Sequence, residues 1–167
     1  MKYGYGRVTM HDLARAARMS RPALYLVFAK KEEVFCGVVR QVAHDTAGDV
    51  KLGLGSARSL LDKLKFVCEI WMVRPFDWIS RSGEAKEIFE SSYEFARDAA
   101  AEGRSLFESD LISVIAQFPK GALPEGVSNR QAAHLLAGAI GGVKKSCGSA
   151  TELRNQIDHL ITMMIRA

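Results

Sequence analysis

The sequence predicts an all-α protein with a small N-terminal helix-turn-helix head and a larger helical body. Apolar residues recur at helical spacing nearly throughout, and no stretch alternates between apolar and polar residues as a surface strand would. Residues 1–46 hold eight basic and four acidic side chains, which leaves +4, the whole formal net charge, because the remaining fifteen basic and fifteen acidic residues cancel. A basic module beside a neutral body indicates a polyanionic partner for the module alone.

Two short helices are expected at the start of the chain. Thr9 is a suitable N-cap for the first, with Asp12 three residues on as in a capping box. After a tight turn, Ser20 can cap the second helix. Pro22 is tolerated in its first turn, because the N–H that proline lacks has no helical partner there. We expect this second helix to end near Phe28.

A third helix is expected from Lys30 or Lys31 to about Asp45, with a buried face made of Val34, Phe35, Val38, Val39 and Val42. The glycine-containing segment GDVKLGLGSA follows and predicts a connection. We therefore place a DNA-binding domain at 1–46 and a ligand-binding and dimerisation domain at 47–167. Within the second domain, we expect a helix from residue 60 that stops before Pro75, a largely helical region at 84–118, a loop at 119–128, and helices at 129–146 and 151–166.

The second short helix has two different faces. Two short helices joined by a brief turn, within a basic module, are typical of a helix-turn-helix, whose second helix lies in the major groove of DNA. Leu24 and Phe28 are four residues apart, so they share one face and are expected to hold the helix to its scaffold. The residues off that face are free to contact DNA.

Each outward residue has a physical use against DNA. The guanidinium of Arg21 can bind guanine through two hydrogen bonds, and Ala23 and Leu26 can contact thymine methyl groups. The hydroxyl of Tyr25 can donate to a phosphate oxygen. Lys31 adds positive charge at the start of the third helix.

The run VTMHDLARAARMSRPALYLVFAKKEEVF resembles the DNA-binding signature of TetR-family transcriptional regulators. The likeness covers about residues 3–43 and rests on Val8–Thr9, Leu13–Ala14, Ala17, Ser20, Leu24–Tyr25, Phe28, Lys31–Glu32 and Val34–Phe35. Beyond these residues the chain is similar to the family only in its all-helical architecture.

The resemblance implies a homodimeric repressor that binds a palindromic DNA operator and releases it when a small molecule occupies the larger domain. By position, it assigns base contacts to Arg21, Pro22, Ala23 and Leu26, and phosphate contacts to Thr9, Tyr25 and Lys31. Family members normally begin with a full helix before this motif, whereas here KYGYG corresponds only to its tail. If the chain starts at Met1, we expect looser packing of the head, because lost burial costs about 1.5–3 kcal/mol for each large apolar side chain. The alternatives are a start placed too late and residues that were removed or omitted.

Aromatic side chains gather in the middle of the chain and allow two interpretations. They can form an ordinary helix-bundle core, or they can line a cavity for a small apolar, aromatic or amphipathic effector. For the second interpretation we predict pocket walls from Trp71, Met72, Phe89 and Tyr93, which lie on helices that the family resemblance would use.

The last two expected helices each carry an apolar stripe. Two such hairpins from two chains would form a four-helix bundle related by twofold symmetry. The alternative is a core within one chain. The predicted dimer interface consists of Leu136, Ile140, Val143, Ile157, Leu160, Ile161 and Met164.

Other classes of function find little support in the sequence. The four histidines are scattered without metal-ligand spacing, and the motifs of a nucleophile elbow or phosphate-binding loop are absent, so we expect neither an enzyme nor a cofactor or metal site. The three cysteines lack ligand spacing and are expected to be free thiols. No apolar run approaches the ~18–20 residues of a membrane span, which favours a cytoplasmic protein. The competing hypothesis is a helical dimer that binds a ligand or a protein partner without effective DNA binding.

Overall fold

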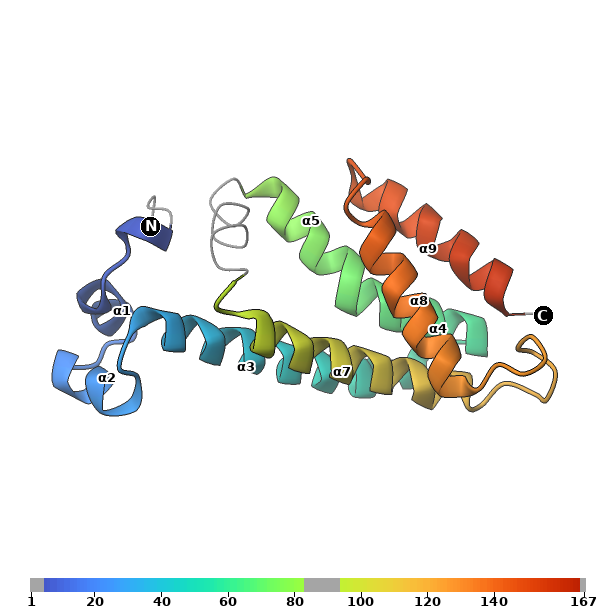
Figure 1. Ribbon diagram of the computed structural model, residues 1–167, viewed down its shortest axis with the longest axis horizontal. Coiled ribbons are helices and arrows are strands. Elements are labelled where there is room, and N and C mark those ends of the chain that lie inside the picture. Colours follow the sequence, from blue (N-terminus) through green and yellow to red (C-terminus); the bar gives the residue numbers. More distant parts are fainter. Residues whose placement is uncertain (1–4, 83–93, 166–167) are drawn as a thin grey trace.

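One long helix links a small N-terminal head to a larger helical body (Figure 1). The computed structural model describes residues 5–82 and 94–165, and none of these lies in a strand. The head contains the 3-10 turn η1 (Tyr5–Arg7), α1 (Met10–Ala16) and α2 (Arg21–Val27), and the linking helix is α3 (Lys31–Gly53). The body contains α4 (Leu60–Cys68), α5 (Arg74–Arg81), α7 (Arg97–Ile115), α8 (Asn129–Val143) and α9 (Ala150–Met164). The all-α class with an N-terminal helix-turn-helix is thereby confirmed.

The head packs around a very small core. Among the described residues of the head, Met10, Ala14 and Leu24 are buried, with Leu13, Phe28 and Val34 partly buried against them. Both expected caps are present: Thr9 caps α1 in a capping box, and Ser20 caps α2 by accepting from the N–H of Ala23 at 3.2 Å. Burial of three residues is a small apolar contribution, so these local hydrogen bonds carry much of the head's order.

Helix α3 is longer than the sequence predicts. It continues past Asp45 through Gly48 to Gly53, so the expected connection at 48–57 is wrong in its first part, and the predicted domain boundary at 46/47 falls inside a helix. Packing against neighbouring helices compensates for the low helix propensity of glycine. At Gly53, the ring of Phe66 occupies the space that a Cβ would need.

The expected buried face of α3 is also wrong in part. Val38 and Val42 are 54% and 56% exposed, whereas Ala43, Ala47 and Val50 are buried. The buried side is the one that faces α7, where the Cβ of Ala43 would lie 3.4 Å from a Cβ on Gly103. Small residues on both helices thus allow α3 and α7 to lie closely side by side.

The helical segment that begins with α4 continues past Pro75, whereas the sequence predicted that it would stop before this residue. A π-helical turn, η3 (Glu69–Val73), joins α4 to α5, and the N–H of Arg74 donates to the carbonyl of Glu69 five residues earlier. Pro75 lies in the first turn of α5, where a missing N–H is tolerated. The widened turn therefore lets the chain remain helical through a proline.

The body has one large core between α4, α7, α8 and α9. Its largest fully buried side chains include Phe107, Leu64 and Leu111. No helix in the described part of the chain is both long enough and apolar enough to cross a membrane.

The predicted dimer interface requires correction. Four of its seven residues, Leu136, Ile140, Ile157 and Ile161, are at most 2% exposed within a single chain. Val143, Leu160 and Met164 are partly buried against the same core. The apolar stripes of α8 and α9 therefore face the chain's own body, and the four buried residues have no surface to offer a second chain.

Candidate nucleic-acid interface

Helix α2 presents one face to the head core and the other to solvent. Leu24 is 4% exposed against α1, and Phe28, directly after the helix, is half-buried in the same cluster. On the opposite side, Leu26 is 88% exposed and Tyr25 is 46% exposed. The division between a scaffold face and a free face therefore follows the expected one.

The residues predicted to contact bases are accessible. Arg21 and Pro22 are exposed in the first turn of α2, Ala23 is half-buried, and Leu26 is exposed near the end of the helix. The structure thus brings all four onto one short helix, close in sequence to the turn between α1 and α2. Their individual contacts with bases remain predictions.

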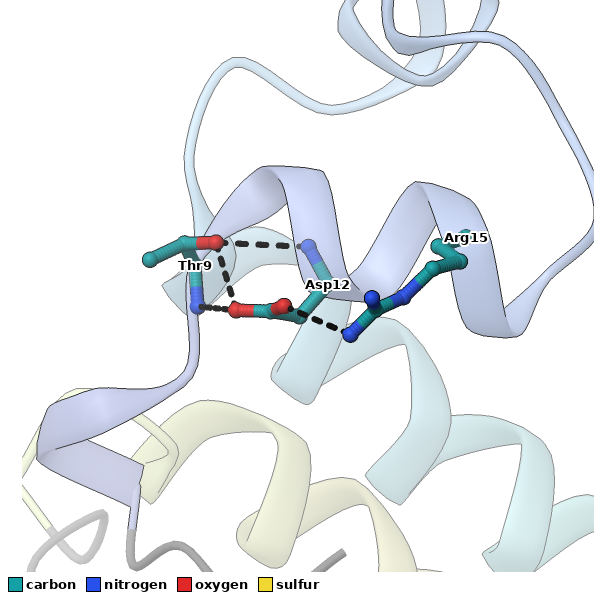
Figure 2. Close-up of polar contacts among 3 residues, drawn as sticks. All are labelled: Thr9, Asp12 and Arg15. Carbon is teal, nitrogen blue, oxygen red and sulfur yellow. Dashed lines mark hydrogen bonds and ion pairs between the residues drawn. The ribbon is translucent and has the colours of Figure 1, made fainter.

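The capping box of α1 uses both donors of Thr9, as Figure 2 shows. The backbone N–H of Thr9 donates to Asp12 Oδ2 at 3.1 Å, and the Thr9 hydroxyl donates to the same oxygen at 2.6 Å. These bonds from Thr9, together with the nearby charge of Arg15, hold the pKa of Asp12 below its ordinary value. A phosphate contact from the Thr9 hydroxyl, which remains a prediction, would require this proton to change its acceptor.

Lys31 connects the head to the start of α3. Its Nζ donates to the carbonyl of Val8 at 3.4 Å and to that of Gly6 at 3.5 Å, and its side chain is half-buried. In this arrangement Lys31 holds the segment before α1 against α3. Its predicted phosphate contact remains a prediction.

The junction between the head and the body lies along α3 and α7. The rings of Phe35 and Phe95 meet edge to face with centroids 5.6 Å apart. One turn further along α3, Arg40 Nε lies 3.0 Å from Glu102 Oε2, and His44 Nε2 lies 3.1 Å from Glu102 Oε1. The sequence analysis missed this cluster, since residues about sixty positions apart gave no local signal.

Two of the four predicted pocket residues lie within the described part of the body. The indole N–H of Trp71 donates to Asp110 Oδ2 at 2.8 Å, and its ring lies 5.9 Å from that of Phe107. Met72 is partly buried against the core. Phe89 and Tyr93 lie outside the described residues. The structure therefore does not test whether the four residues line one cavity.

Asp110 is a buried charged residue that sequence analysis did not single out. It is 8% exposed, and burial raises the pKa of its carboxyl group above the ordinary value, although the Trp71 hydrogen bond and the charge of Lys51 act in the opposite direction. Its position in the sequence could have indicated burial, because Asp110 lies three residues after Phe107 and four before Val114, both on the buried face of α7.

An open cleft of about 730 Å³ lies between α7 and α8. Its lining mixes apolar and polar side chains, and His134 Nδ1 lies 3.1 Å from Glu108 Oε1 at its edge. Trp71 and Met72 are not among its lining residues. The complete lining is Ser105, Glu108, Ser109, Ile112, Val127, Arg130, Gln131, His134 and Leu135.

Metal and thiol chemistry have no evident site in the described residues. Over 5–82 and 94–165, no three or more His, Cys, Asp or Glu side chains gather in a way that could hold a metal ion. Cys36, Cys68 and Cys147 are free thiols. Burial raises the pKa of Cys68 to about 12, so this thiol stays protonated at neutral pH.

Comparisons with known proteins agree with this geometry. The sequence model of the family described as bacterial regulatory proteins, tetR family, matches residues 1–36. The fold is similar to that of FadR from Thermus thermophilus, a TetR-family transcriptional repressor solved in complex with lauroyl-CoA, with 19% identity and a TM-score of 0.60 over 99% of this chain and 90% of that one. It is also similar to a structure described as superantigen pfit, with 19% identity and a TM-score of 0.57 over 97% and 81% of the two chains. No curated protein matches the sequence.

The N-terminal motif has the geometry of a helix-turn-helix and is joined to an all-helical body. The tetR-family model matches the segment that contains this motif, and the chain as a whole shares its fold with a TetR-family repressor.

Proposed function

We propose that the protein is a homodimeric repressor that binds a palindromic operator and releases it when a small molecule binds the body. The two-sided geometry of α2 is the observation that carries this proposal. Leu24 holds the helix on α1 while Arg21, Pro22 and Leu26 stay free to enter a major groove. Operator binding would place the protein in the cytoplasm and requires no chemical reaction.

The outer face of α8 and α9 is the proposed dimer interface in place of the buried stripes. Leu135, which also lines the α7–α8 cleft, is 59% exposed on α8, and Met163 is 83% exposed on α9. Gly138 and Gly142 are also exposed one turn apart, and a Cβ at either position would touch nothing within the chain. Glycine lowers helix stability by about 1 kcal/mol relative to alanine. Close packing of a helix from a second chain against Gly138 and Gly142 would offset this cost.

Exposed residues allow a matched test of this interface. We expect Leu135→Glu and Met163→Glu to shift the protein from dimer to monomer in sedimentation experiments, because each places a charge in the proposed contact. Leu52→Glu is the control, since Leu52 is 86% exposed and belongs to α3 rather than to α8 or α9. A monomeric wild-type protein, or an unchanged dimer in both α8–α9 variants, would rule out this interface.

The proposed effector is an apolar, aromatic or amphipathic small molecule. Trp71, Met72, Phe89 and Tyr93 remain the proposed walls of its site, and the solved complex of the similar FadR with lauroyl-CoA supports an amphipathic ligand. Such a ligand weakens operator binding only by the difference between its affinities for the DNA-bound and released forms. Lauroyl-CoA is the probe: we expect it to reduce operator binding and to change Trp71 fluorescence in a Trp78→Phe background.

Titration against the DNA upstream of the protein's own gene tests the operator directly. Binding is measured by fluorescence anisotropy at several salt concentrations, with random DNA of equal length as the competitor. We expect a preference of about a thousandfold or more and a steep loss of affinity as salt rises. Equal binding to both DNAs would contradict the operator and leave the second candidate below.

The small head core favours that second candidate, a dimeric helical module that binds ligand without effective DNA binding. Only Met10, Ala14 and Leu24 are buried in the described head, and Val27, three residues after Leu24, is 65% exposed. If the head is ordered in only a fraction of the molecules, the apparent affinity for DNA is reduced in proportion to that fraction. Effector binding and dimerisation in the absence of operator binding would identify this case.

A further inference from the structure

Arg18 has an unusual backbone conformation in the turn between α1 and α2. Its φ is +55°, and among residues 5–82 and 94–165 it is the one residue other than glycine with a positive φ. The left-handed region brings the Cβ of an L-amino acid too close to the following carbonyl oxygen, a penalty that glycine avoids.

The hydrogen bonds around Arg18 explain why the chain needs this conformation. The N–H of Arg18 donates to the carbonyl of Arg15 at 3.2 Å, and the N–H of Met19 donates to that of Ala14 at 3.0 Å. This pair of bonds is a Schellman motif, in which the left-handed residue that ends the helix is usually glycine. The backbone of the turn therefore needs a left-handed residue, and nothing in it needs an arginine.

The side chain of Arg18 makes no polar contact within the described residues that would offset the cost of this backbone conformation. It is exposed and has no hydrogen-bond or ion-pair partner among residues 5–82 and 94–165. By contrast, Arg15 is paired with Asp12 at 3.2 Å. The cost of placing arginine in the left-handed region is thus left without an internal gain, which is a reason to look for a function of the side chain outside the fold.

The location of Arg18 indicates what that function is. It lies two residues before the cap Ser20 and three before the exposed Arg21, at the end of α2 that a helix-turn-helix directs into the major groove. The sugar-phosphate strands border that groove, and arginine is a common partner of their phosphates. We propose that the Arg18 guanidinium binds a DNA phosphate at the edge of the groove read by α2. This inference rests on the proposed operator binding.

The variant Arg18→Gly separates a role in DNA binding from a role in the fold. Because glycine suits the left-handed position, we expect a Tm equal to or above that of the wild type. We also expect about tenfold weaker binding to operator and random DNA alike, with the slope of log K against log salt reduced by about 0.9. Arg18→Lys keeps a cation and the same backbone penalty, and should retain the wild-type salt slope.

Arg58→Gly is the matched control, because Arg58 is an exposed arginine of the body, in the connection between α3 and α4. It should leave affinity and slope unchanged. If wild-type protein binds the operator and Arg18→Gly keeps its affinity and slope, the Arg18 proposal is overturned alone. A lower Tm for Arg18→Gly, or altered sequence preference, would also overturn it, in favour of a structural or base-reading role. Wild-type protein without any operator preference would overturn it together with the proposed function.

Discussion

The described body core contains twenty buried residues, whereas the head core contains Met10, Ala14 and Leu24. The body is held together mainly by apolar burial between helices that are distant in sequence. The head depends more on interactions between near neighbours, namely two N-caps and the turn that follows α1. Local openings are easiest where few apolar contacts are made, so the proposed DNA-binding region is also the less stable one. Each prediction below tests this difference, from the largest expected effect to the smallest.

Phe107→Ala should have the largest effect on the body. Phe107 is 1% exposed in the centre of the core, and removal of a buried phenylalanine ring costs about 3–5 kcal/mol. Urea denaturation followed by circular dichroism measures this loss of unfolding free energy. A loss below about 1 kcal/mol would show that the body core tolerates a cavity and is less tightly packed than its burial indicates.

Leu24→Ala should act on the head alone. Leu24 is the buried side chain through which α2 packs on the head core. We expect the substitution to remove about 2–3 kcal/mol of local stability. This is the lower end of the range for buried leucines, because a small core can collapse around the lost side chain. Hydrogen exchange should accelerate at amides of α1 and α2 while protection in α7 and α8 stays unchanged. Loss of protection throughout the chain would mean that the head and body unfold together.

The two capping boxes allow the same change to be made in each region. Thr9 and Asp12 form one at α1, and Ser128 and Gln131 form the other at α8. Thr9→Ala and Ser128→Ala should each remove about 1 kcal/mol of helix stability. We expect Thr9→Ala to reduce protection from exchange in α1 with little change in the Tm of the body, and Ser128→Ala to lower that Tm. An equal fall in Tm for both variants would contradict the separation.

Acid should weaken the α1 cap selectively. The pKa of Asp12 is lower in the folded protein than its ordinary value. At pH values above that ordinary pKa, the ionised carboxylate therefore stabilises the fold. This contribution is lost as the pH falls through the lowered pKa. The amide of Gln131 does not titrate in this range. Exchange at α1 should therefore accelerate below about pH 4 more than at the start of α8. Asp12→Asn should remove the pH dependence specific to α1.

Glu102→Gln should have the smallest effect, although its side chain bridges α3 and α7. Its partners Arg40 and His44 are about half exposed, and exposed ion pairs contribute about 0–1 kcal/mol. We expect a loss below about 1 kcal/mol by urea denaturation, with a smaller difference at 1 M salt than at 0.05 M. A larger loss would show that polar contacts, rather than Ala43, Ala47 and Val50, hold α3 on the body.

The sequence predicted the head better than the body because the head is built from local signals. The caps Thr9 and Ser20, the capping partner Asp12 and the anchoring role of Leu24 all depend on residues within a few positions of each other. The outward face of α2 followed from the same spacing.

The body required information that a single stripe of apolar residues does not carry. Ile140 and Ile157 lie on well-formed stripes, but periodicity does not tell whether the surface against them belongs to the same chain or to another. For the same reason Val38 was expected to be buried and Ala43 was not, since only the position of α7 decides between them. Asp110 was overlooked because a charged residue on a buried face is explained only by its distant partner Trp71.

The unbroken course of α3 has a mechanical consequence. Twenty-three residues of helix span about 34 Å, and the helix belongs to the head at its first turn and to the body core at Val50 near its last. A stiff rod of this length converts a tilt of about 6° at the body into a displacement of about 3–4 Å at the other end. Adjacent base pairs are 3.4 Å apart along one strand, so a rotation this small moves α2 by about one base-pair step.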